Sequence, residues 1–171
     1  MMDLERLVAA IGAVDVVGRA SVEVGDLAYD TRAVVPGALY FCVPGARADG
    51  HDFADEAIAR GAVALVVERP LAVPVPQVVV PDARVAMAPA ADAFFDHPTR
   101  ELQVAGVTGT NGKTTTSFLL FAILAAAKRR PGLIGTVEAR VGGERRGVKR
   151  TTRRHLRLVV TESTGSRRSP R

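Results

Sequence analysis

Residues 106–116, GVTGTNGKTTT, combine the groups that a phosphate-binding site requires. A bound polyphosphate needs converging backbone N–H donors, a nearby cation and room for the backbone to approach it. Gly109 and Gly112 supply the room and Lys113 supplies the positive charge. The hydroxyl of Thr114 can bind the Mg²⁺ that bridges phosphate oxygens. This combination predicts a phosphate-binding loop.

The spacing of the glycines departs from the common motif. That motif has a glycine five residues before the Gly-Lys pair, but Val107 holds this position, with Gly106 six residues back and Gly109 three. The alternative is an ordinary glycine-rich turn with an exposed lysine. Because the stretch follows the apolar segment LQVAGVT and opens a segment rich in Leu and Ala, we favour nucleotide binding.

The elements that must position this loop form one strand–loop–helix–strand unit. We expect a strand at 102–108, a helix at 114–127 and a second strand at 132–137. Two strands joined by a crossover helix make one βαβ unit of a parallel sheet.

The residues before the loop have the pattern of a separate α/β part. An apolar stripe at helical spacing predicts a short helix at 4–11, and two short strands follow, broken by Pro-Gly pairs at 36–37 and 44–45. DGHDFADEAIARGA is typical of a helix with Asp52 near its start and Gly61 at its end.

Two buried strands and a helix complete this first part. AVALVVE and PQVVVPD predict the strands, and residues 83–95 predict a helix that Pro89 should kink. The polar segment 96–101, DHPTRE, is the best candidate for a domain boundary. The chain as a whole is therefore expected to be α/β, in two parts.

The composition indicates a globular cytoplasmic protein. Hydrophobic residues make up 47% of the chain, and the single cysteine, Cys42, excludes an internal disulfide framework and a cysteine-based zinc site. The N-terminus lacks the basic flank and apolar core of a signal peptide. The longest apolar run, 118–127, has half the length of a membrane span, so we expect no membrane partner.

The basic character of the chain is confined to its end. The net charge is +5, but residues 144–171 contain ten Lys or Arg and two acids, whereas residues 1–143 contain 13 bases and 16 acids. We expect contacts with nucleic acid, if there are any, only from this basic tail.

Two separate motifs resemble the Mur ligases. GVTGTNGKTTT resembles the ATP loop of that family, Thr-Gly-Thr-Asn-Gly-Lys-Thr, which also lacks the standard first glycine. YDTRAVVPGALYFCVPGARADGHDF resembles the uridine-nucleotide-binding domain of the UDP-N-acetylmuramoyl-tripeptide synthetases in that family, with Thr31 replacing the Ser of their Asp-Ser-Arg motif. GLIGTVEARVGG and the pair Thr151-Thr152 resemble the segment that reaches the muramoyl substrate, so the resemblance covers residues 1 to about 152.

The resemblance implies a fold and a reaction. It implies a UDP-MurNAc-binding domain at 1–98, the first βαβ portion of a truncated ATP-binding central domain at 99–152, and a basic, disordered or unrelated tail at 153–171. Such enzymes use ATP and Mg²⁺ to join meso-diaminopimelate or L-lysine to UDP-MurNAc-L-Ala-D-Glu through an acyl phosphate, as part of peptidoglycan synthesis. A monomer is expected.

The resemblance also implies roles for particular residues. Lys113 would stabilise transferring phosphate charge as the catalytic residue, and Thr114 would bind the metal. The ATP-binding residues would be Gly109, Thr110, Asn111, Gly112, Lys113, Thr114 and Thr115. The substrate-binding residues would be Tyr29, Thr31, Ala46, Arg47 and Ala48 for the uridine nucleotide, and Thr151 and Thr152 for the muramoyl peptide.

Simpler interpretations stand beside these roles. Thr31 and Arg32 could form an ordinary turn with a surface salt bridge, and residues 140–150 could be a solvated hairpin. No acid or nucleophile recognisably pairs with His51, so a capping or surface position is favoured over catalysis. Cys42 lies in an apolar strand and is expected in the core.

Several parts that the family uses are missing from the sequence. After Val137 no apolar strand ends in an acid that could complete the Mg²⁺ site, and LRLVVTES is a poor candidate for a buried strand. Residues 153–171 lack the Pro-Glu continuation of the family, which suggests a truncated or frame-shifted product with little turnover. Translating the other frames beyond codon 152 tests this hypothesis.

Other functions remain open. The chain could be a non-catalytic module that binds UDP-muramoyl peptides, or another ligase of this type, such as the enzyme that adds D-Ala-D-Ala. A folate polyglutamating enzyme is disfavoured by the DTR, PG and DGH motifs. The resemblance implies that the residues that choose the amino acid lie in a C-terminal domain outside these 171 residues, so we expect no prediction of that amino acid from them.

Overall fold

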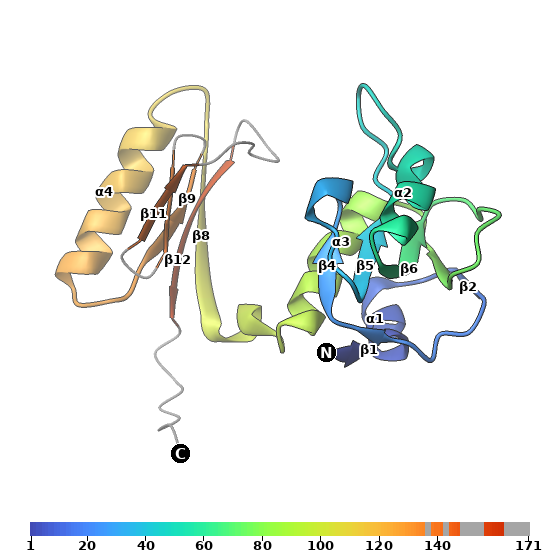
Figure 1. The fold of residues 1–171 in the computed structure, drawn as a ribbon. Helices are drawn as coiled ribbons and strands as arrows, with labels where there is room; N and C mark the ends of the chain where they lie inside the picture. The colour runs from blue at the N-terminus through green and yellow to red at the C-terminus, as the bar shows by residue number, and fades with distance from the viewer. Residues whose placement is uncertain (136–137, 142–143, 148–155, 163–171) are drawn as a thin grey trace, which may run out of the picture. The chain divides into compact units, whose positions relative to one another are not determined.

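The computed structural model describes residues 1–135, 138–141, 144–147 and 156–162. The chain divides into two compact units, residues 1–97 (unit 1) and 98–171 (unit 2), and the division falls within the polar segment 96–101. Figure 1 labels most of their helices and strands. Among the described residues, no helix is long and apolar enough to cross a membrane.

Unit 1 is built on a five-stranded sheet in the order β2-β7-β6-β5-β4 (Figure 1). Strands β4 to β7 run parallel to their neighbours, and β2 pairs antiparallel with β7. A separate antiparallel pair joins β1 to β3. The strands are β1 (Met2–Asp3), β2 (Asp15–Val17), β3 (Glu23–Val24), β4 (Asp26–Ala28), β5 (Ala38–Phe41), β6 (Ala62–Val67) and β7 (Gln77–Val79).

The central strands are buried on both faces, as parallel sheets with helices on both sides require. All four residues of β5 are buried. Leu39 and Phe41 belong to one core cluster, which also contains residues of helices α1 and α3. Ala38 and Tyr40 belong to a second cluster, which contains residues of α2. The alternation of side chains along β5 therefore divides the core into two layers.

The first layer is closed by α1 (Leu4–Ile11) and α3 (Ala83–Phe94). The expected apolar stripe of α1 is confirmed, because its buried residues are Leu4, Leu7 and Ile11. Four alanines form the buried face of α3, which lets its backbone approach the sheet closely. Pro89 lies inside α3 and cannot donate the N–H bond of a normal helical residue; the kink expected there stays a prediction.

The helix expected from DGHDFADEAIARGA begins differently from the prediction. Its first turn is a 3₁₀ helix, η2 (Gly50–Phe53), and only then follows α2 (Ala54–Ala59). Asp49, rather than Asp52, caps the start, because its side chain accepts the backbone N–H of His51. Gly61 follows the helix as expected, with a φ of 102° that favours glycine.

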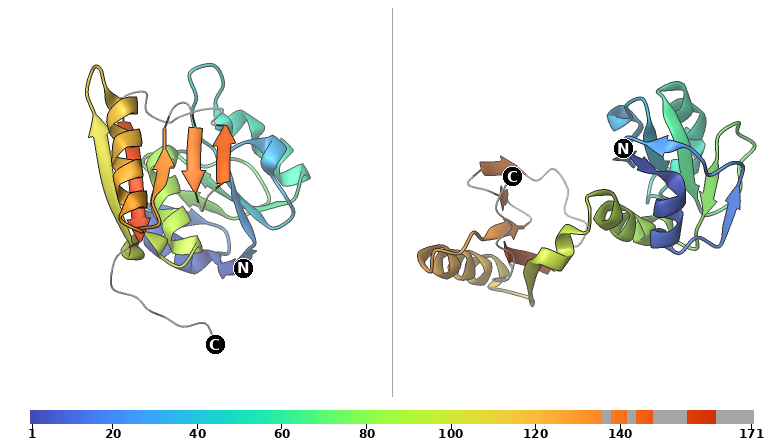
Figure 2. Two further views of the ribbon diagram at one scale, coloured as in Figure 1. Left: turned by 90° about the vertical axis from the view of Figure 1, so that its left-hand side faces the viewer. Right: turned by 90° about the horizontal axis from the view of Figure 1, so that it is seen from below.

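Unit 2 contains a second five-stranded sheet, in the order β11-β10-β9-β12-β8. Helix α4 (Lys113–Ala126) contacts β8, β9 and β12, and lies along the sheet in Figure 2. A short 3₁₀ helix, η3 (Pro98–Glu101), leads into β8. The strands are β8 (Leu102–Thr108), β9 (Gly132–Ile134), β10 (Glu138–Val141), β11 (Glu144–Gly147) and β12 (Leu156–Glu162).

The expected pairing of unit 2 needs two corrections. Strands β8 and β9 run in the same direction, but they are not neighbours, because β12 lies between them and pairs antiparallel with both. The segment 156–162, which was judged a poor candidate for a buried strand, forms β12 and has a strand on either side of it. Its register with β8 extends over seven residues, and such a long-range ladder does not show in the local sequence. The expected hairpin is present as β10 and β11.

Candidate functional site

The predicted phosphate loop joins the end of β8 to the first residue of α4. Gly109 has a φ of 142° and Gly112 a φ of 76°, in the region that disfavours other residues. A Cβ on Gly112 would have no atom within 4 Å. Backbone conformation, rather than lack of room, is therefore what requires glycine at this position. The loop can keep this shape although Val107 replaces the glycine of the common motif.

The start of α4 presents backbone N–H groups to the loop. Gly112 is the N-cap and has no side chain that could accept their hydrogen bonds. The helical ladder begins with the N–H of Thr116, which donates to Gly112 O at 2.9 Å. The three preceding amides, 113–115, therefore have no acceptor within the helix, and the positive end of the helix dipole lies at the same place. An anion is the natural acceptor here.

Lys113 is folded over this loop. Its Nζ donates to Gly109 O, and it also lies 3.2 Å from Thr110 O. Thr114 is exposed, and its carbonyl accepts a bond from the buried Ser117 hydroxyl at 2.9 Å. The ammonium group thus lies beside the loop and Thr114 is an exposed residue, and the roles expected of both stay predictions. Thr110, Asn111 and Thr115 are also exposed.

Acidic, histidine and cysteine side chains that could bind a metal are not gathered in the described part of the chain. Among those residues, no group of three or more His, Cys, Asp or Glu could hold a metal ion. Thr151 and Thr152, the residues expected to reach the muramoyl peptide, lie outside the described residues.

The predicted uridine-nucleotide residues gather at the carboxyl ends of the parallel strands of unit 1. Tyr29 and Thr31 directly follow β4, and residues 46–48 follow β5. In open α/β sheets this edge is where ligands bind. Tyr29 is 62% exposed, but Thr31 is only 9% exposed, so its hydroxyl is less accessible than Tyr29.

The turn after β4 is also held by a surface ion pair. Arg32 contacts Asp30 at 2.5 Å, and the hydrogen bond that Arg32 donates to the Asp30 carboxylate raises the pKa of Arg32. The side chain of Asp30 caps the 3₁₀ helix η1 (Thr31–Ala33). The simpler interpretation of this motif, a turn with a surface salt bridge, is thus confirmed, and it is compatible with ligand contacts from Tyr29.

Residues 43–50 form a closed loop beyond β5 (Figure 1). Gly45 N donates to Ala48 O at 2.9 Å, and Gly50 N donates to Val43 O at 3.1 Å. An isolated bridge pairs Pro44 with Asp49. The exposed tip of this loop carries the three predicted binding residues, Ala46, Arg47 and Ala48.

A capping or surface position was expected for His51, since no acid recognisably paired with it, but the residue is buried and an acid does contact it. It is 4% exposed, and its Nδ1 lies 2.6 Å from Asp49 Oδ1. Its Nε2 accepts the backbone N–H of Glu68 at 2.9 Å. The Asp-Gly-His motif places Asp49 and His51 two residues apart, so the sequence contained a signal for their contact. The second partner of His51, the N–H of Glu68, lies 17 residues away, and no local motif indicates it.

Cys42 is buried as expected. Burial raises the pKa of its thiol to about 12, so the reactive thiolate is not formed near neutral pH. Burial likewise raises the pKa of the neighbouring core residue Tyr40 to about 12. Both side chains therefore belong to the core rather than to a reactive site.

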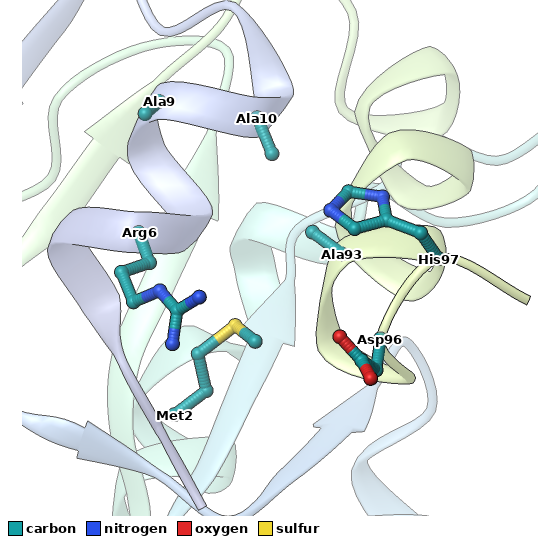
Figure 3. Close-up of a pocket in the computed structure, with 7 residues that line it drawn as sticks. All are labelled: Met2, Arg6, Ala9, Ala10, Ala93, Asp96 and His97. Carbon is teal, nitrogen blue, oxygen red and sulfur yellow. The ribbon is translucent and has the colours of Figure 1, made fainter.

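A cavity of about 410 Å³ lies away from all the predicted residues. It is formed at the far end of α3, between that helix and α1 (Figure 3). It contains none of the groups at the carboxyl ends of the strands, so it does not enlarge the candidate site. Its lining residues are Met2, Arg6, Ala9, Ala10, Ala93, Asp96 and His97.

Solved structures support this fold. The structure resembles MurF from Acinetobacter baumannii with a TM-score of 0.54 and 24% identity, over 72% of this chain and 27% of that one. At this identity the likeness concerns the fold alone.

Sequence relatives are considerably closer. A UDP-N-acetylmuramoyl-L-alanyl-D-glutamate–2,6-diaminopimelate ligase of Geobacillus thermodenitrificans is 53% identical over 135 residues, which are 79% of this chain and 28% of the relative. The enzyme of that name in Halalkalibacterium halodurans is 42% identical over 94% of this chain and 33% of its own length. A UDP-N-acetylmuramyl-tripeptide synthetase of Roseiflexus sp. is 49% identical over 70% of this chain and 24% of its own length.

These matches define what part of the relatives is represented. The chain spans about a quarter to a third of their length. A match over 94% of the chain also includes part of residues 153–171, the segment expected to be unrelated. The model of the Mur ligase family, catalytic domain, matches residues 23–107. This range includes the residues predicted to bind the uridine nucleotide and ends two residues before Gly109. With its relatives, this match shows that the chain belongs to the Mur ligase family.

Proposed function

We propose that this chain is part of an ATP-dependent ligase that joins diaminopimelate or L-lysine to UDP-MurNAc-L-Ala-D-Glu in peptidoglycan precursor synthesis. The names of the relatives at 53% and 42% identity support the substrate class. The observation that supports the proposal most is the phosphate loop, in which Gly109 and Gly112 have positive φ angles and the ammonium of Lys113 lies beside the loop carbonyls, in a chain of this family.

The proposed roles divide between the two units. In unit 1, Tyr29, Thr31 and the tip 46–48 bind the uridine nucleotide. In unit 2, residues 109–115 bind ATP, with Lys113 holding the β- and γ-phosphates and Thr114 contributing a hydroxyl ligand to Mg²⁺. Bound ATP supplies the phosphoryl group that activates the substrate carboxylate, and the incoming amine then displaces phosphate.

The position of Lys113 suggests how the loop responds to nucleotide. Its ammonium contacts the carbonyls of Gly109 and Thr110, which are neutral acceptors. Phosphate oxygens are charged acceptors and form stronger bonds with an ammonium. We therefore propose that Lys113 leaves these carbonyls and binds the phosphates, so that the cation already lies where charge develops during transfer.

Binding of MgATP to the chain tests the proposal. We expect Lys113→Ala to weaken binding at least tenfold, as measured by isothermal titration calorimetry. Lys128→Ala is the matched control, since Lys128 lies just beyond the other end of α4, about 20 Å away along a helix of this length. Equal effects of the two substitutions, or tight binding by the Lys113→Ala variant, would refute the role of the loop.

A second candidate function is a module that binds UDP-muramoyl peptides without catalysis. The distribution of the core supports it, because among the residues whose burial is described (1–135, 138–141 and 144–145) every buried hydrophobic except Leu133 lies in unit 1. Saturable UDP-ligand binding together with no MgATP binding would favour this candidate. A D-Ala-D-Ala-adding ligase remains the third, and amino-acid incorporation by the complete enzyme distinguishes it. We further propose a cytoplasmic, monomeric enzyme.

A further inference from the structure

Residues 44–49 make up the part of the closed loop that lies between Val43 and Gly50, and they are called the 44–49 loop. The buried side chain of His51 holds one end of this loop by hydrogen bonds. The imidazole Nε2 accepts the N–H of Glu68, at the end of β6, so the ring proton must be on Nδ1. Nδ1 therefore donates to Asp49 Oδ1 at 2.6 Å. This places a neutral imidazole between the end of the loop and the end of β6. Its 4% exposure keeps water from competing for either bond.

Asp49 connects this histidine to an arginine. Its Oδ1 also accepts the backbone N–H of His51 at 3.0 Å, and its Oδ2 accepts Arg69 Nη2 at 2.8 Å. Hydrogen bonds from the backbone and side chain of His51, followed by that from Arg69, hold the pKa of Asp49 well below its usual range. The last residue of the loop is therefore a carboxylate bonded through both oxygens.

The first residue of the loop is fastened by a different side chain. Arg84, in the first turn of α3, donates to Pro44 O at 3.1 Å. The start of α3 is itself tied to the end of β6, because Glu68 Oε1 accepts the N–H of Ala83 at 2.9 Å. Both ends of the loop are thus bonded to neighbouring parts of unit 1.

The closing residues leave little freedom at the base of the loop. A Cβ on Gly50 would lie 2.7 Å from Val43 O, and one on Gly45 would lie 2.8 Å from Ala48 O. The two backbone segments at the base of the loop therefore pack directly against one another. Exposed connecting loops are usually mobile, so this number of fixed contacts at the base of an exposed loop requires an explanation.

We propose that Asp49, His51, Arg69 and Arg84 are positioning residues that order residues 45–48 before the uridine nucleotide binds. This inference rests on the proposed function, in which the tip contacts the nucleotide. Ordering a loop during binding weakens affinity, and a loop that is already ordered avoids this loss. The two arginines act at opposite ends of the loop, so either one can be removed while the other remains.

Two measurements on the 171-residue chain test the proposal. The first is the affinity for UDP-MurNAc-L-Ala-D-Glu, and the second is the hydrogen-exchange rate of the Gly45 and Gly50 amides without ligand. We expect Arg69→Ala and Arg84→Ala each to raise the Kd about 5- to 10-fold and to accelerate exchange. Arg69→Lys, which can keep one charged bond to Asp49, should recover part of both effects.

Arg60→Ala is the matched control. Arg60 forms an ion pair with Glu56 at 2.9 Å and is 45% exposed, close to the 54% of Arg69. It precedes β6, whereas Arg69 follows it, so the two lie at opposite ends of that strand. We expect Arg60→Ala to leave the Kd and both exchange rates unchanged. Unchanged thermal unfolding of the two loop variants would show that unit 1 remains folded.

The outcomes separate this inference from the proposed function. Wild-type affinity and exchange rates in both the Arg69→Ala and Arg84→Ala variants would overturn the positioning role, as would an equal effect of Arg60→Ala. If the wild-type chain does not bind the UDP ligand, the proposed function and the ligand role of the loop both fail. The exchange rates then still decide whether these residues order the loop.

Discussion

The two units of this chain use similar elements with very different degrees of burial. In unit 1 the central strand β5 is buried at every position, between helices on both faces. In unit 2 the strand that leads to the phosphate loop, β8, has no buried residue, and the only buried residue of α4 is Ser117. Hydrophobic burial is the main stabilising term in folding, so unit 1 should supply most of the stability of this chain.

This difference shows that a binding loop and a stable core are separable. The phosphate loop gets its shape from two glycines and the start of one helix, which are local features. The loop at 44–49 instead depends on contacts with β6 and α3, which exist only once unit 1 has folded. We therefore expect the two candidate sites to respond differently to substitutions in the core.

The largest expected effect comes from truncating one leucine in each unit. Leu39→Ala in β5 should lower the free energy of unfolding by about 3 kcal/mol, because Leu39 is fully buried. Leu119→Ala in α4 should change it by less than about 0.5 kcal/mol, because Leu119 is 61% exposed. Urea unfolding of unit 1 is followed by tyrosine fluorescence, since Tyr29 and Tyr40 are the only tyrosines and the chain has no tryptophan, and unfolding of both units is followed by far-UV circular dichroism. Similar losses in both variants would remove the contrast between the units.

The second prediction concerns acid. The pKa of Asp49 is lower in the folded than in the unfolded state, so the carboxylate stabilises unit 1 above its unfolded pKa of about 4. This contribution should fall as the pH drops below that value toward the folded pKa. Asp49→Asn should therefore be less stable than wild type at pH 7, and the difference should shrink steadily below pH 4 in the same tyrosine assay. A difference independent of pH would contradict this assignment.

The third prediction concerns the sheet edges. Strand β8 is an edge strand of seven residues, whereas the edge strands of unit 1, β2 and β4, have three each. Long apolar edges promote association, and a lysine blocks it. Val104 lies on β8 and is 55% exposed. Val104→Lys should raise several-fold the highest concentration at which the chain is still monomeric in analytical ultracentrifugation. Val17→Lys on β2 is the control and should have no effect.

The smallest expected effect tests the hairpin of unit 2. The guanidinium of Arg140 lies 4.8 Å from the ring centroid of Phe118 and 5.5 Å from that of Phe121, which joins β10 to α4. Arg140→Ala should destabilise unit 2 by about 1 kcal/mol or less, visible as a shift in far-UV circular dichroism melting. The tyrosine transition of unit 1 should not move. Arg145→Ala, opposite Arg140 in the hairpin, should leave both signals unchanged.

Local patterns in the sequence were sufficient for much of the fold. The stripe of Leu4, Leu7 and Ile11 predicted α1, and the apolar runs predicted β5 and β6. The phosphate loop was predicted from residue types alone, whereas the positive φ angles of Gly109 and Gly112 are a finding of the structure. These features depend on neighbours in sequence, which is why they could be found without the structure.

The features that were missed depend on distant residues. Strand β12 pairs with β8 across some fifty residues of sequence, and this pairing separates β8 from β9. The buried His51 accepts a hydrogen bond from the N–H of Glu68, 17 residues away. The carbonyl of Pro44 accepts one from Arg84, 40 residues away. Such contacts are products of the tertiary fold, so no local motif could reveal them.

The central claim is that the two units bind two different ligands, and one titration tests it most directly. Adding UDP-MurNAc-L-Ala-D-Glu to the chain should give a saturable change in tyrosine fluorescence, because Tyr29 lies exposed beside the candidate site in unit 1. Arg47→Ala at the loop tip should weaken this binding about tenfold, and Lys113→Ala in unit 2 should leave it unchanged. The absence of a saturable change, or an equal loss of affinity in the Lys113→Ala variant, would contradict the account.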